Sequence, residues 1–404
     1  MDKLKPKNIA VISIYSFPYG LAPTNRILAY SKGMVENGAN VTVYIPFPTD
    51  KYDCMNKLPE HDNFHDINYI YTSGRYKSKI KILRGIADLF GIRKLKGYIS
   101  FLSSIYKNNR IQAIDCIIIS TDYIPSLFTF AVIAKILKSK SVFIFDEYPI
   151  PIRHKLKNKI PVWKELLYKA VLKLIDGYIS ISNTLERYYK NLCFKKTLII
   201  SAVTDVSRYD LLPKKKIDVE YLCYMGNMEL SKDNVDIIIK AFSLISEKHP
   251  LLQLHLYGNP NKVIIKILEV LIQDLNLKEK VIIKGIANYN DVPDILKCAK
   301  ILVSSQPDTI RASGGFPTKL GEYLASGVPA VMTNVGENAK FVIDGVHIFF
   351  TKPSDYEAYS EKLLYILENY TQACTVASNG KEYILKNFSH NKKGRELLEF
   401  ISKI

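Results

Sequence analysis

The sequence predicts an α/β protein of two domains, each built around a parallel β-sheet. Short apolar runs alternate with helix-length segments through both halves of the chain, which is the pattern of strands joined by crossover helices. The length of 404 residues suits two domains of ordinary size. The alternation stops between Ala202 and Val219, where Asp, Pro and three consecutive lysines intervene. We therefore predict one domain over 1–205 and a second over 217–389.

The first half opens with the apolar run Ile9–Ile14, which Tyr, Ser and Pro follow too soon for a secretory segment. It therefore predicts a strand. Helices are predicted over 24–37 and 125–137, and the other short apolar runs are typical of buried strands. The further strands predicted in this half are Val41–Ile45, Ile67–Tyr71, Asp115–Ser120, Ser141–Phe145, Tyr178–Ser182 and Thr197–Ser201.

The second half repeats the alternation. Two such sheets predict two Rossmann-like domains facing a cleft, with ligands at the carboxyl ends of the strands. The strands predicted in this half are Tyr221–Met225, Gln253–Tyr257, Val281–Lys284, Ile301–Ser304 and Ala330–Thr333.

A short helix after two glycines is the most informative local feature. Pro317 suits its first position, and Lys319 and Glu322, three residues apart, share one face. Gly327 is expected to take the left-handed conformation that ends the helix, and Pro329 prevents its continuation. A helix start of this kind offers free N–H groups and a positive dipole end to a phosphate. An ordinary capped helix is the alternative.

The composition predicts a folded protein without a membrane span. Hydrophobic residues make up 48% and charged residues 24%, as in core-forming chains. No run approaches the roughly 18 apolar residues that a membrane span requires. The six cysteines include no C-x-x-C pair, which favours buried thiols in a reducing cytosol over disulfides or a zinc site.

Positive charge is concentrated in the first half. Residues 1–200 hold 31 Lys and Arg against 15 Asp and Glu, whereas residues 201–404 hold 25 against 24. Two basic clusters, at 75–110 and 153–173, are interleaved with apolar and aromatic side chains, which suits an anionic membrane surface. A solvated lysine face is one alternative, and nucleic acid is another that lacks a recognisable motif. The residues expected at the membrane or acceptor are Arg84, Arg93, Lys94, Lys96 and Trp163.

The polar stretch from Glu60 to Asp66 allows two interpretations. His61 and His65, four residues apart, would share a metal site if the stretch were helical. Its polarity, just before the strand predicted at Ile67–Tyr71, instead favours a loop. No D-x-D motif for a metal–nucleotide complex occurs, so we predict catalysis without a metal or other cofactor.

The run Gly315–Pro329, GFPTKLGEYLASGVP, resembles the donor-site signature of family 4 (group 1) glycosyltransferases. Members of this family are retaining enzymes of the GT-B fold that use nucleotide-sugar donors. Weaker landmarks, such as Leu256–Gly258 and Asp344–Gly345, extend the resemblance over roughly residues 220–360. The resemblance implies a GT-B architecture, in which the C-terminal helix at 390–404 crosses back onto the first domain.

The resemblance also implies a donor site with two departures. Lys232 matches a lysine that holds the diphosphate, and Glu322 a glutamate on the ribose. Asn227 stands in place of an arginine, a loss that Lys319 can partly offset, and Gly314 stands in place of a glutamate near the sugar. The donor-binding residues so implied are Gly20, Asn227, Lys232, Ile286, Gly315, Phe316, Pro317, Thr318, Lys319 and Glu322.

Acidic residues follow two strands of the first domain. Asp122 follows the strand at Asp115–Ser120, and Asp146, with Glu147 beside it, follows the next strand. An acid there could take the proton of an acceptor hydroxyl, although strand-end carboxylates often only cap helices. We predict Asp122, Asp146 and Lys232 as catalytic residues.

Together these features predict a bacterial-type retaining glycosyltransferase on the cytoplasmic face of a membrane. Its partners would be a nucleotide-sugar, an anionic membrane surface and a lipid-linked glycan in polysaccharide assembly, with no role for nucleic acid. A GT-B sugar-nucleotide epimerase and a non-catalytic nucleotide-sugar-binding protein are the alternatives. The departures at Gly314 and Asn227 keep the second of these open.

Overall fold

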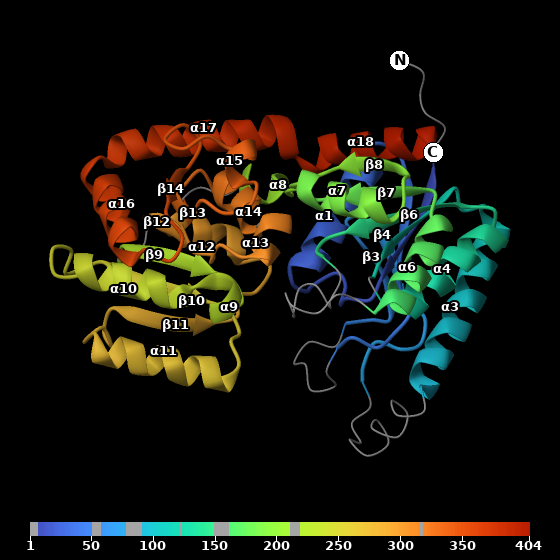
Figure 1. Cartoon of the computed structure of the whole chain (residues 1–404), viewed down its shortest axis with the longest axis horizontal. Coiled ribbons are helices and arrows are strands. Elements are labelled where there is room, and N and C mark those ends of the chain that lie inside the picture. The colour runs from blue at the N-terminus through green and yellow to red at the C-terminus, as the bar shows by residue number, and fades with distance from the viewer. Residues whose placement is uncertain are drawn as a thin grey trace. The chain divides into compact units, whose positions relative to one another are not determined.

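The computed structural model describes residues 7–50, 58–77, 91–121, 123–148, 161–210, 219–315 and 318–404. The predicted site residues Arg84, Asp122, Phe316 and Pro317 lie outside these residues. The chain forms two compact units, unit 1 from Met1–Val203 with His390–Ile404 and unit 2 from Thr204–Ser389 (Figure 1). Both are α/β units around a largely parallel sheet, which confirms the predicted fold class.

Unit 1 contains an eight-stranded sheet in the order β3-β4-β2-β1-β5-β6-β7-β8. All neighbouring strands are parallel except β3 and β4. Because the inner strands are buried on both faces, their sequences are continuous apolar runs, which made them predictable. The strands are β1 (Asn8–Ser13), β2 (Asn40–Ile45), β3 (His61–Phe64), β4 (Ile67–Tyr71), β5 (Cys116–Ser120), β6 (Lys140–Phe145), β7 (Gly177–Ser180) and β8 (Lys196–Ile199).

The loop predicted at Glu60–Asp66 was wrong, because His61–Phe64 forms the edge strand β3. β3 pairs antiparallel with β4 through a tight turn at His65 and Asp66, whose φ angles are 53° and 61°. Both residues adopt the left-handed conformation that suits the twist of a hairpin. The strand lies at the edge of the sheet, so its polar side chains need no burial. Because these side chains are polar, β3 lacks the apolar pattern by which the other strands were predicted.

Helices cover the sheet of unit 1, and the C-terminal helix is one of them, as predicted. α18 packs against α1 so closely that a Cβ on Gly33 would lie 1.9 Å from the carbonyl oxygen of His390. Glu36 accepts hydrogen bonds from His390 and Asn391 across this contact. The helices are α1 (Ala22–Glu36), α3 (Ile92–Ile111), α4 (Ile124–Ile136), α6 (Val162–Lys173), α7 (Asn183–Leu192) and α18 (His390–Lys403).

Unit 2 contains a six-stranded parallel sheet in the order β11-β10-β9-β12-β13-β14. The chain order reverses between β9 and β12, which makes this the doubly wound arrangement with its switch point there. The strands are β9 (Tyr221–Met225), β10 (Gln253–Tyr257), β11 (Val281–Gly285), β12 (Ile301–Ser304), β13 (Ala330–Thr333) and β14 (Phe349–Thr351). The helices are α8 (Ser207–Asp210), α9 (Leu230–Asp233), α10 (Val235–Ile245), α11 (Lys262–Asp274), α12 (Val292–Cys298), α13 (Ile310–Gly314), α14 (Thr318–Ser326), α15 (Asn338–Phe341), α16 (Tyr356–Glu368) and α17 (Tyr370–Phe388).

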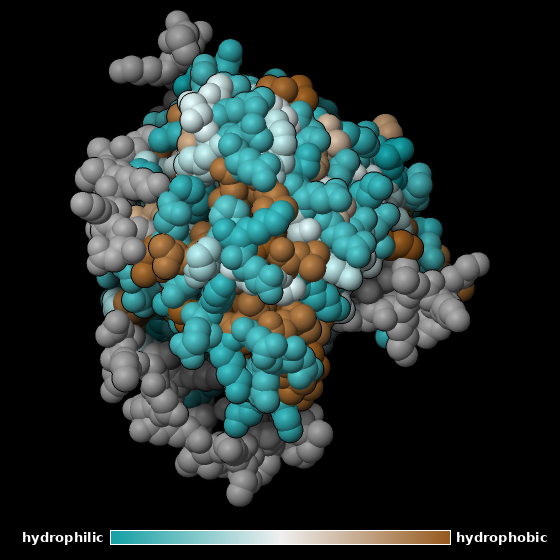
Figure 2. All heavy atoms as spheres, turned by 90° about the vertical axis from the view of Figure 1, so that its left-hand side faces the viewer, coloured by the Kyte–Doolittle hydropathy of each residue, from teal (hydrophilic) through white to brown (hydrophobic). Residues whose placement is uncertain are grey.

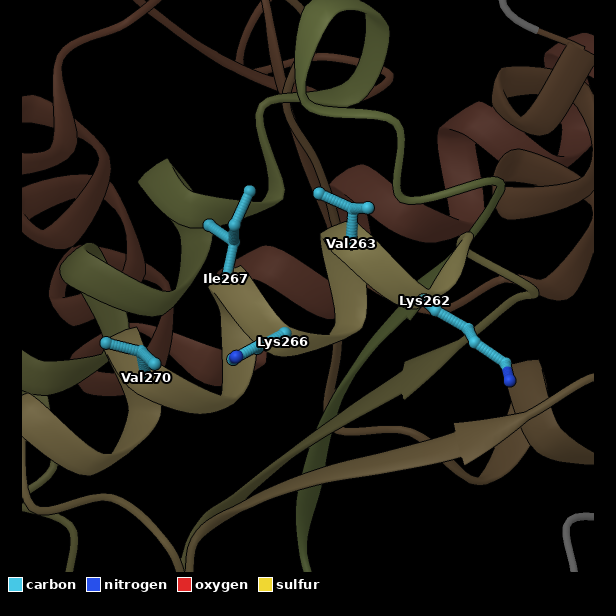
Figure 3. Close-up of a pocket in the computed structure, with 5 residues that line it drawn as sticks. All are labelled: Lys262, Val263, Lys266, Ile267 and Val270. Atoms are coloured by element: carbon cyan, nitrogen blue, oxygen red, sulfur yellow. The ribbon is translucent and has the colours of Figure 1, made fainter.

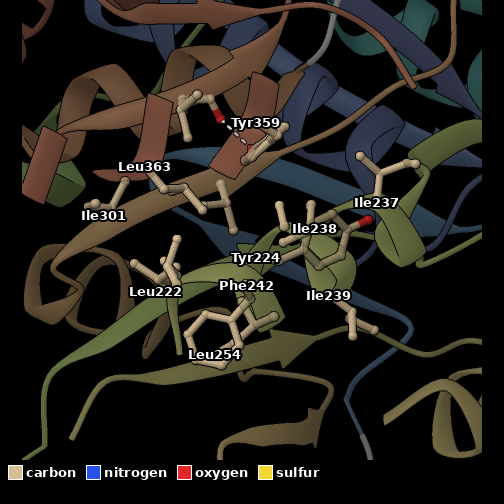
Figure 4. Packing of buried hydrophobic residues seen from close by; sticks show 14 of the residues in the cluster. Leu222, Tyr224, Ile237, Ile238, Ile239, Phe242, Leu254, Ile301, Tyr359 and Leu363 are labelled. Carbon is tan, nitrogen blue, oxygen red and sulfur yellow. Dashed lines mark hydrogen bonds between the residues drawn. The ribbon is translucent and has the colours of Figure 1, made fainter. Parts of the chain in front are cut away.

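The core of unit 2 lies between its sheet and helices such as α10 and α16 (Figure 4). Leu222, Phe242 and Leu363 are fully buried there. The hydroxyl of Tyr359 donates toward the carbonyl oxygens of Ser304 and Val331, so one buried side chain joins β12 to β13. The face that lies at the left of Figure 1 is mainly hydrophilic with scattered hydrophobic residues (Figure 2). Among the described helices none is long and apolar enough to cross a membrane.

Candidate functional site

The carboxyl ends of β9 and β12 meet at the switch point of unit 2, and α14 is fixed to both strands. The hydroxyl of Tyr323 donates to the carbonyl oxygen of Val303 at 3.2 Å and accepts from the amide of Met225 at 3.1 Å. Tyr323 is itself buried. One side chain of α14 therefore sets the distance of this helix from the sheet edge at which ligands bind in doubly wound folds.

The C-terminal end of α14 agrees with the prediction, whereas Pro317, predicted at its first position, lies outside the described residues. The helix ends at Ser326, and Gly327 has a φ of 70°, the left-handed conformation expected of it. At the other end α13 stops at Gly314, Gly315 is extended, and α14 begins at the exposed residue Thr318. The helix of nine residues thus directs its N-terminal end toward an accessible part of the surface.

Lys319 lies beside the turn that follows β9. Its ammonium group forms an ion pair with Asp233 at 2.9 Å and lies 4.5 Å from the centre of the Tyr224 ring. A Cβ on Gly226 would be 2.8 Å from the same Nζ atom. The side chain of Asp233 is 3% exposed, and its second oxygen has no hydrogen-bond partner among the described residues. The structure thus brings the positive charge of Lys319 to the turn that follows β9, the first strand of unit 2.

Three more of the predicted donor-binding residues follow strands of the same sheet. Asn227 follows β9 and is exposed, and Lys232 is a half-buried residue of α9, next to Asp233. Ile286 follows β11 and is 72% exposed. These residues come from segments that follow two strands of one sheet, but no contact joins Lys232 or Ile286 directly to Lys319 within the described structure.

Glu322 is a half-buried residue of α14 with a cationic neighbour that the sequence analysis did not single out. Arg208 Nη1 lies 3.6 Å from Glu322 Oε1. Burial raises the pKa of Glu322 above its ordinary value of 4.5, and the Arg208 guanidinium partly offsets this effect. Arg208 also lies over the ring of Tyr289, 3.7 Å from its centre, and donates a hydrogen bond to its carbonyl oxygen.

Sequence analysis missed Arg208, Tyr289, Asp233 and Tyr224. Arg208 belongs to the segment that was interpreted as a domain boundary, and its partners follow it by 81 and 114 residues. The only local signal was the proximity of Asp233 to Lys232 in sequence.

In unit 1 the predicted acid Asp146 follows β6 and forms an ion pair with Arg26 of α1, whose side chain is 8% exposed. Gly20 lies in the turn before α1, where a Cβ would be 2.2 Å from Thr24 Oγ1. Thr24 donates to the carbonyl oxygen of Ser16, so this glycine permits a capped turn.

Of the residues predicted at a membrane or acceptor, Arg93, Lys94 and Lys96 lie at the start of α3, and Trp163 lies on α6. Lys94 Nζ is 4.0 Å from the centre of the Tyr123 ring. The Trp163 side chain is 62% exposed. No group of three His, Cys, Asp or Glu residues able to hold a metal occurs in the described parts of the chain.

A shallow groove lies on α11, away from these residues (Figure 3). Lys262, Val263, Lys266, Ile267 and Val270 line it, and all five belong to a single helix face. No predicted donor-binding residue contributes to it. We therefore take the switch-point edge, and not this groove, as the candidate site.

A doubly wound sheet with a short helix N-terminus, two lysines and a glutamate at its switch point is an arrangement typical of nucleotide-binding α/β proteins. Residues 212–383 match the family model of glycosyl transferases group 1. This segment of the chain is therefore similar to the group 1 glycosyltransferases.

Relatives of known structure share the fold over the whole chain. A glycosyltransferase from Rickettsia africae ESF-5 has a TM-score of 0.71 at 16% identity and covers 99% of each chain. HepE from Anabaena, in complex with UDP and glucose, has a TM-score of 0.70 at 15% identity and covers 98% of this chain and 100% of its own. Mannosylfructose-phosphate synthase from Agrobacterium fabrum is 28% identical over 161 residues, which are 38% of this chain. The match spans about a third, 34%, of that relative's length.

Proposed function

We propose that the protein is a retaining glycosyltransferase that binds a nucleotide-sugar at the switch-point edge of unit 2. The observation that carries this proposal is the arrangement on α14, where Lys319 lies against the β9 turn and Glu322 is held by Arg208. Both residues lie in the segment that is similar to the group 1 glycosyltransferases. HepE, which shares the fold, was solved with UDP and glucose, and this supports a nucleoside diphosphate as the ligand.

Each charged group then has a chemical task. The N-terminal end of α14, together with Lys232 and Lys319, would neutralise the negative charge that develops on the leaving diphosphate. Glu322 would accept hydrogen bonds from the ribose hydroxyls. Two lysines supply the positive charge that a metal ion supplies in other transferases, so the reaction would need no metal.

Asp146 would act on the acceptor from unit 1. Its carboxylate would accept the proton of an acceptor hydroxyl, and the ion pair with Arg26 would hold the carboxylate in place for this role. Asp122 remains a second candidate for this task.

The acceptor would be lipid-linked, and a surface of unit 1 supports this part of the proposal. α3 carries an exposed apolar stripe at intervals of three and four residues, which places its members on one face of the helix. α6 carries a second exposed apolar group that includes Trp163. Basic residues flank both helices, as in helices that lie on anionic membranes. The stripe consists of Ile92, Leu95, Ile99, Leu102 and Tyr106, and the α6 group of Val162, Trp163, Leu166 and Leu167.

α3, α4 and α6 form one layer of unit 1 (Figure 1). Tyr98 of α3 bonds to Ser126 of α4 at 2.7 Å, and α4 also packs against α6. Both apolar groups thus belong to the same helical layer. A membrane-bound position on the cytoplasmic face fits an enzyme of surface-polysaccharide assembly.

A panel of UDP-, GDP-, ADP- and dTDP-sugars tests the donor site. We expect one nucleotide-sugar to raise the melting temperature of the wild-type protein, and Glu322→Ala and Lys232→Ala to weaken this effect. Slow hydrolysis of the same donor would indicate a transferase without its acceptor. The anomeric configuration of the released or transferred sugar, determined by NMR, tests the retaining mechanism.

A non-catalytic nucleotide-sugar-binding protein is the second candidate, favoured by the glycine at 314 and the asparagine at 227. Binding without hydrolysis, and without transfer to lipid-linked acceptors, would support it. Conversion of the donor sugar without any acceptor would instead reveal an epimerase. No binding of any donor would reject the roles of Glu322 and Lys232.

Flotation with phosphatidylcholine vesicles, with and without phosphatidylglycerol, tests the membrane surface. Leu95→Glu and Trp163→Ala should reduce flotation with anionic vesicles. Leu251→Glu is the matched control, since Leu251 is 87% exposed and lies in unit 2. Equal flotation of all three variants would reject the surface on α3 and α6.

A further inference from the structure

Arg208 is held by three contacts within unit 2. Its Nη1 atom lies 3.6 Å from Glu322 Oε1, and its Nη2 atom donates to the carbonyl oxygen of Tyr289. Its guanidinium group lies over the Tyr289 ring, 3.7 Å from the centre. The Arg208 side chain is 13% exposed. An arginine with a stacked face and a bonded edge has little freedom, so it presents its charge to Glu322 in a fixed direction.

The backbone that carries Arg208 is also fixed. The amide of Thr204 donates to the carbonyl oxygen of Phe388 at 3.0 Å. The Thr204 side chain packs on α14 at Gly321, where a Cβ would lie 2.2 Å from Thr204 Oγ1. Gly321 precedes Glu322 directly. The contact between Thr204 and Gly321, which fixes segment 204–210 on α14, is therefore adjacent to Glu322, the partner of Arg208.

The carboxylate of Glu322 retains its capacity to accept hydrogen bonds. At 3.6 Å the Arg208 contact is an ion pair that is too long for a hydrogen bond. Across the described residues no group donates a hydrogen bond to Glu322. The hydroxyl of Tyr209, next to Arg208, is buried and likewise has no hydrogen-bond partner in the described structure.

We infer that Arg208 is a positioning residue of the donor site, which keeps the Glu322 carboxylate ionised and oriented to accept hydrogen bonds from the ribose hydroxyls of the donor. Tyr289 in turn orients Arg208. The inference rests on the proposed function for the identity of the ligand, a nucleoside diphosphate. The contact between Arg208 and Glu322 does not depend on that identity.

The ionisable groups around Glu322 explain why its charged state depends on Arg208. Burial raises the pKa of Glu322, and Arg208 is the cation that opposes this effect. Burial and, after it, the charge of Glu322 raise the pKa of Tyr209. Burial is also the main cause that raises the pKa of Tyr323, so both tyrosines stay neutral. Asp205, which also acts on Tyr209, adds negative charge. Without Arg208, the described surroundings of Glu322 would raise its pKa further.

The first arm of the test uses the free protein. In protein labelled with ¹³C-glutamate, the Cδ resonance of Glu322 is assigned by its loss in Glu322→Gln and followed against pH. In Arg208→Met we expect its titration midpoint to rise by about one pH unit or more. Arg208→Lys, which keeps the charge, should restore most of the difference. An unchanged midpoint in folded Arg208→Met would overturn the inference.

The second arm measures binding of UDP and 2′-deoxy-UDP by calorimetry against pH. Wild-type protein should bind UDP about tenfold more tightly, because 2′-deoxy-UDP lacks one hydroxyl donor to a charged acceptor. Arg208→Met should lose most of this preference at pH values below the raised midpoint of Glu322 and regain part of it above that midpoint, where Glu322 ionises again. A purely structural role would weaken both ligands equally at every pH, and that result would contradict the inference.

Lys248→Met is the matched control, because it removes one positive charge from an exposed position of the same unit. It should change neither the titration midpoint of Glu322 nor the preference for UDP over 2′-deoxy-UDP. If wild-type protein binds no nucleotide or nucleotide-sugar, the proposed function fails. A raised midpoint in the first arm would in that case still support the coupling between Arg208 and Glu322.

Discussion

The ammonium group of Lys319 lies 2.9 Å from Oδ1 of Asp233, so a cation of α14 is bound to a carboxylate at the end of α9. Both side chains are largely buried, at 14% and 3% exposed. The same ammonium group lies beside Gly226, one residue before Asn227, the position at which the family resemblance implies an arginine. Lys319, which is distant in sequence, thus places a positive charge beside the turn in which Asn227 replaces the expected arginine.

Replacing Lys319 by methionine should have two separable effects. It leaves the buried Asp233 carboxylate without a partner, so we expect the free energy of unfolding to fall by about 3 kcal/mol in urea denaturation. It also removes a diphosphate contact, so donor affinity should fall about tenfold or more. Asp233→Asn in the same chain should recover much of the stability but not the affinity. Recovery of both would mean that Lys319 acts only in folding.

Replacing Asn227 by arginine should supply the cation that the family resemblance implies at this position. Asn227 is exposed, so the longer side chain can be accommodated without repacking the core. We expect donor affinity, measured by calorimetry, to rise several-fold, up to about tenfold. Gln273→Arg, at an exposed position of α11, adds the same charge elsewhere in the unit and should have no effect. An equal gain in both variants would indicate a non-specific charge effect.

The contact between α1 and α18 should not tolerate a larger residue. A Cβ on Gly394 would lie 2.1 Å from the carbonyl carbon of Gly33, which is backbone and cannot move aside. Gly394→Ala should therefore destabilise unit 1 by about 2 kcal/mol or more, seen as faster hydrogen exchange in α1 and α18. Glu399→Ala, at an exposed position of the same helix, is the control. Unchanged exchange in Gly394→Ala would contradict the observed packing.

Glu36 should make unit 1 sensitive to acid. Burial alone would raise its pKa, but hydrogen bonds from Asn391 and His390 outweigh burial and lower the pKa below the ordinary 4.5. Because the folded-state pKa is depressed, this stabilisation is present above pH 4.5 and is lost as the pH falls through the folded-state value. The protection of the α18 amides against hydrogen exchange, taken relative to the intrinsic exchange rate at each pH, should therefore fall below that pH in the wild type. In Glu36→Gln the fall should be smaller, and an identical pH profile would be evidence against this role.

Removal of metal ions should leave the reaction unchanged. Lys232 and Lys319 provide positive charge at the donor edge, and the sequence has no D-x-D motif. We expect equal rates of donor hydrolysis in EDTA and in Mg²⁺. A rate that depends on Mg²⁺ would require a metal-binding carboxylate that our proposal lacks.

Much of the fold was predictable because both sheets are parallel and buried. Strands such as Cys116–Ser120 and Ala330–Thr333 are continuous apolar runs, which a sequence reveals without ambiguity. The edge strand His61–Phe64 was not predictable on that basis, since its pairing depends on a left-handed turn and not on burial. The end of α14 at Gly327 was predictable because only a few residues favour its backbone conformation.

The candidate site was predictable only where its residues are close in sequence. Lys319 and Glu322 share one short helix, so their common face follows from spacing. Their partners Asp233 and Arg208 are 86 and 114 residues away, and their pairing depends on the order of strands in the sheet. The predicted roles of Asp122, Asp146 and Lys232 in the reaction remain predictions.

The place of α18 has a consequence for how the chain is made. Because His390–Lys403 covers α1, residues 1–203 lack one of the helices of their own unit until residues 390–403 have also been translated. Unit 2 is a single continuous stretch and can complete itself earlier. The unit whose synthesis begins first is therefore the last to be finished, and in the meantime the face of α1 around Gly33 is open to chaperones and to other nascent chains.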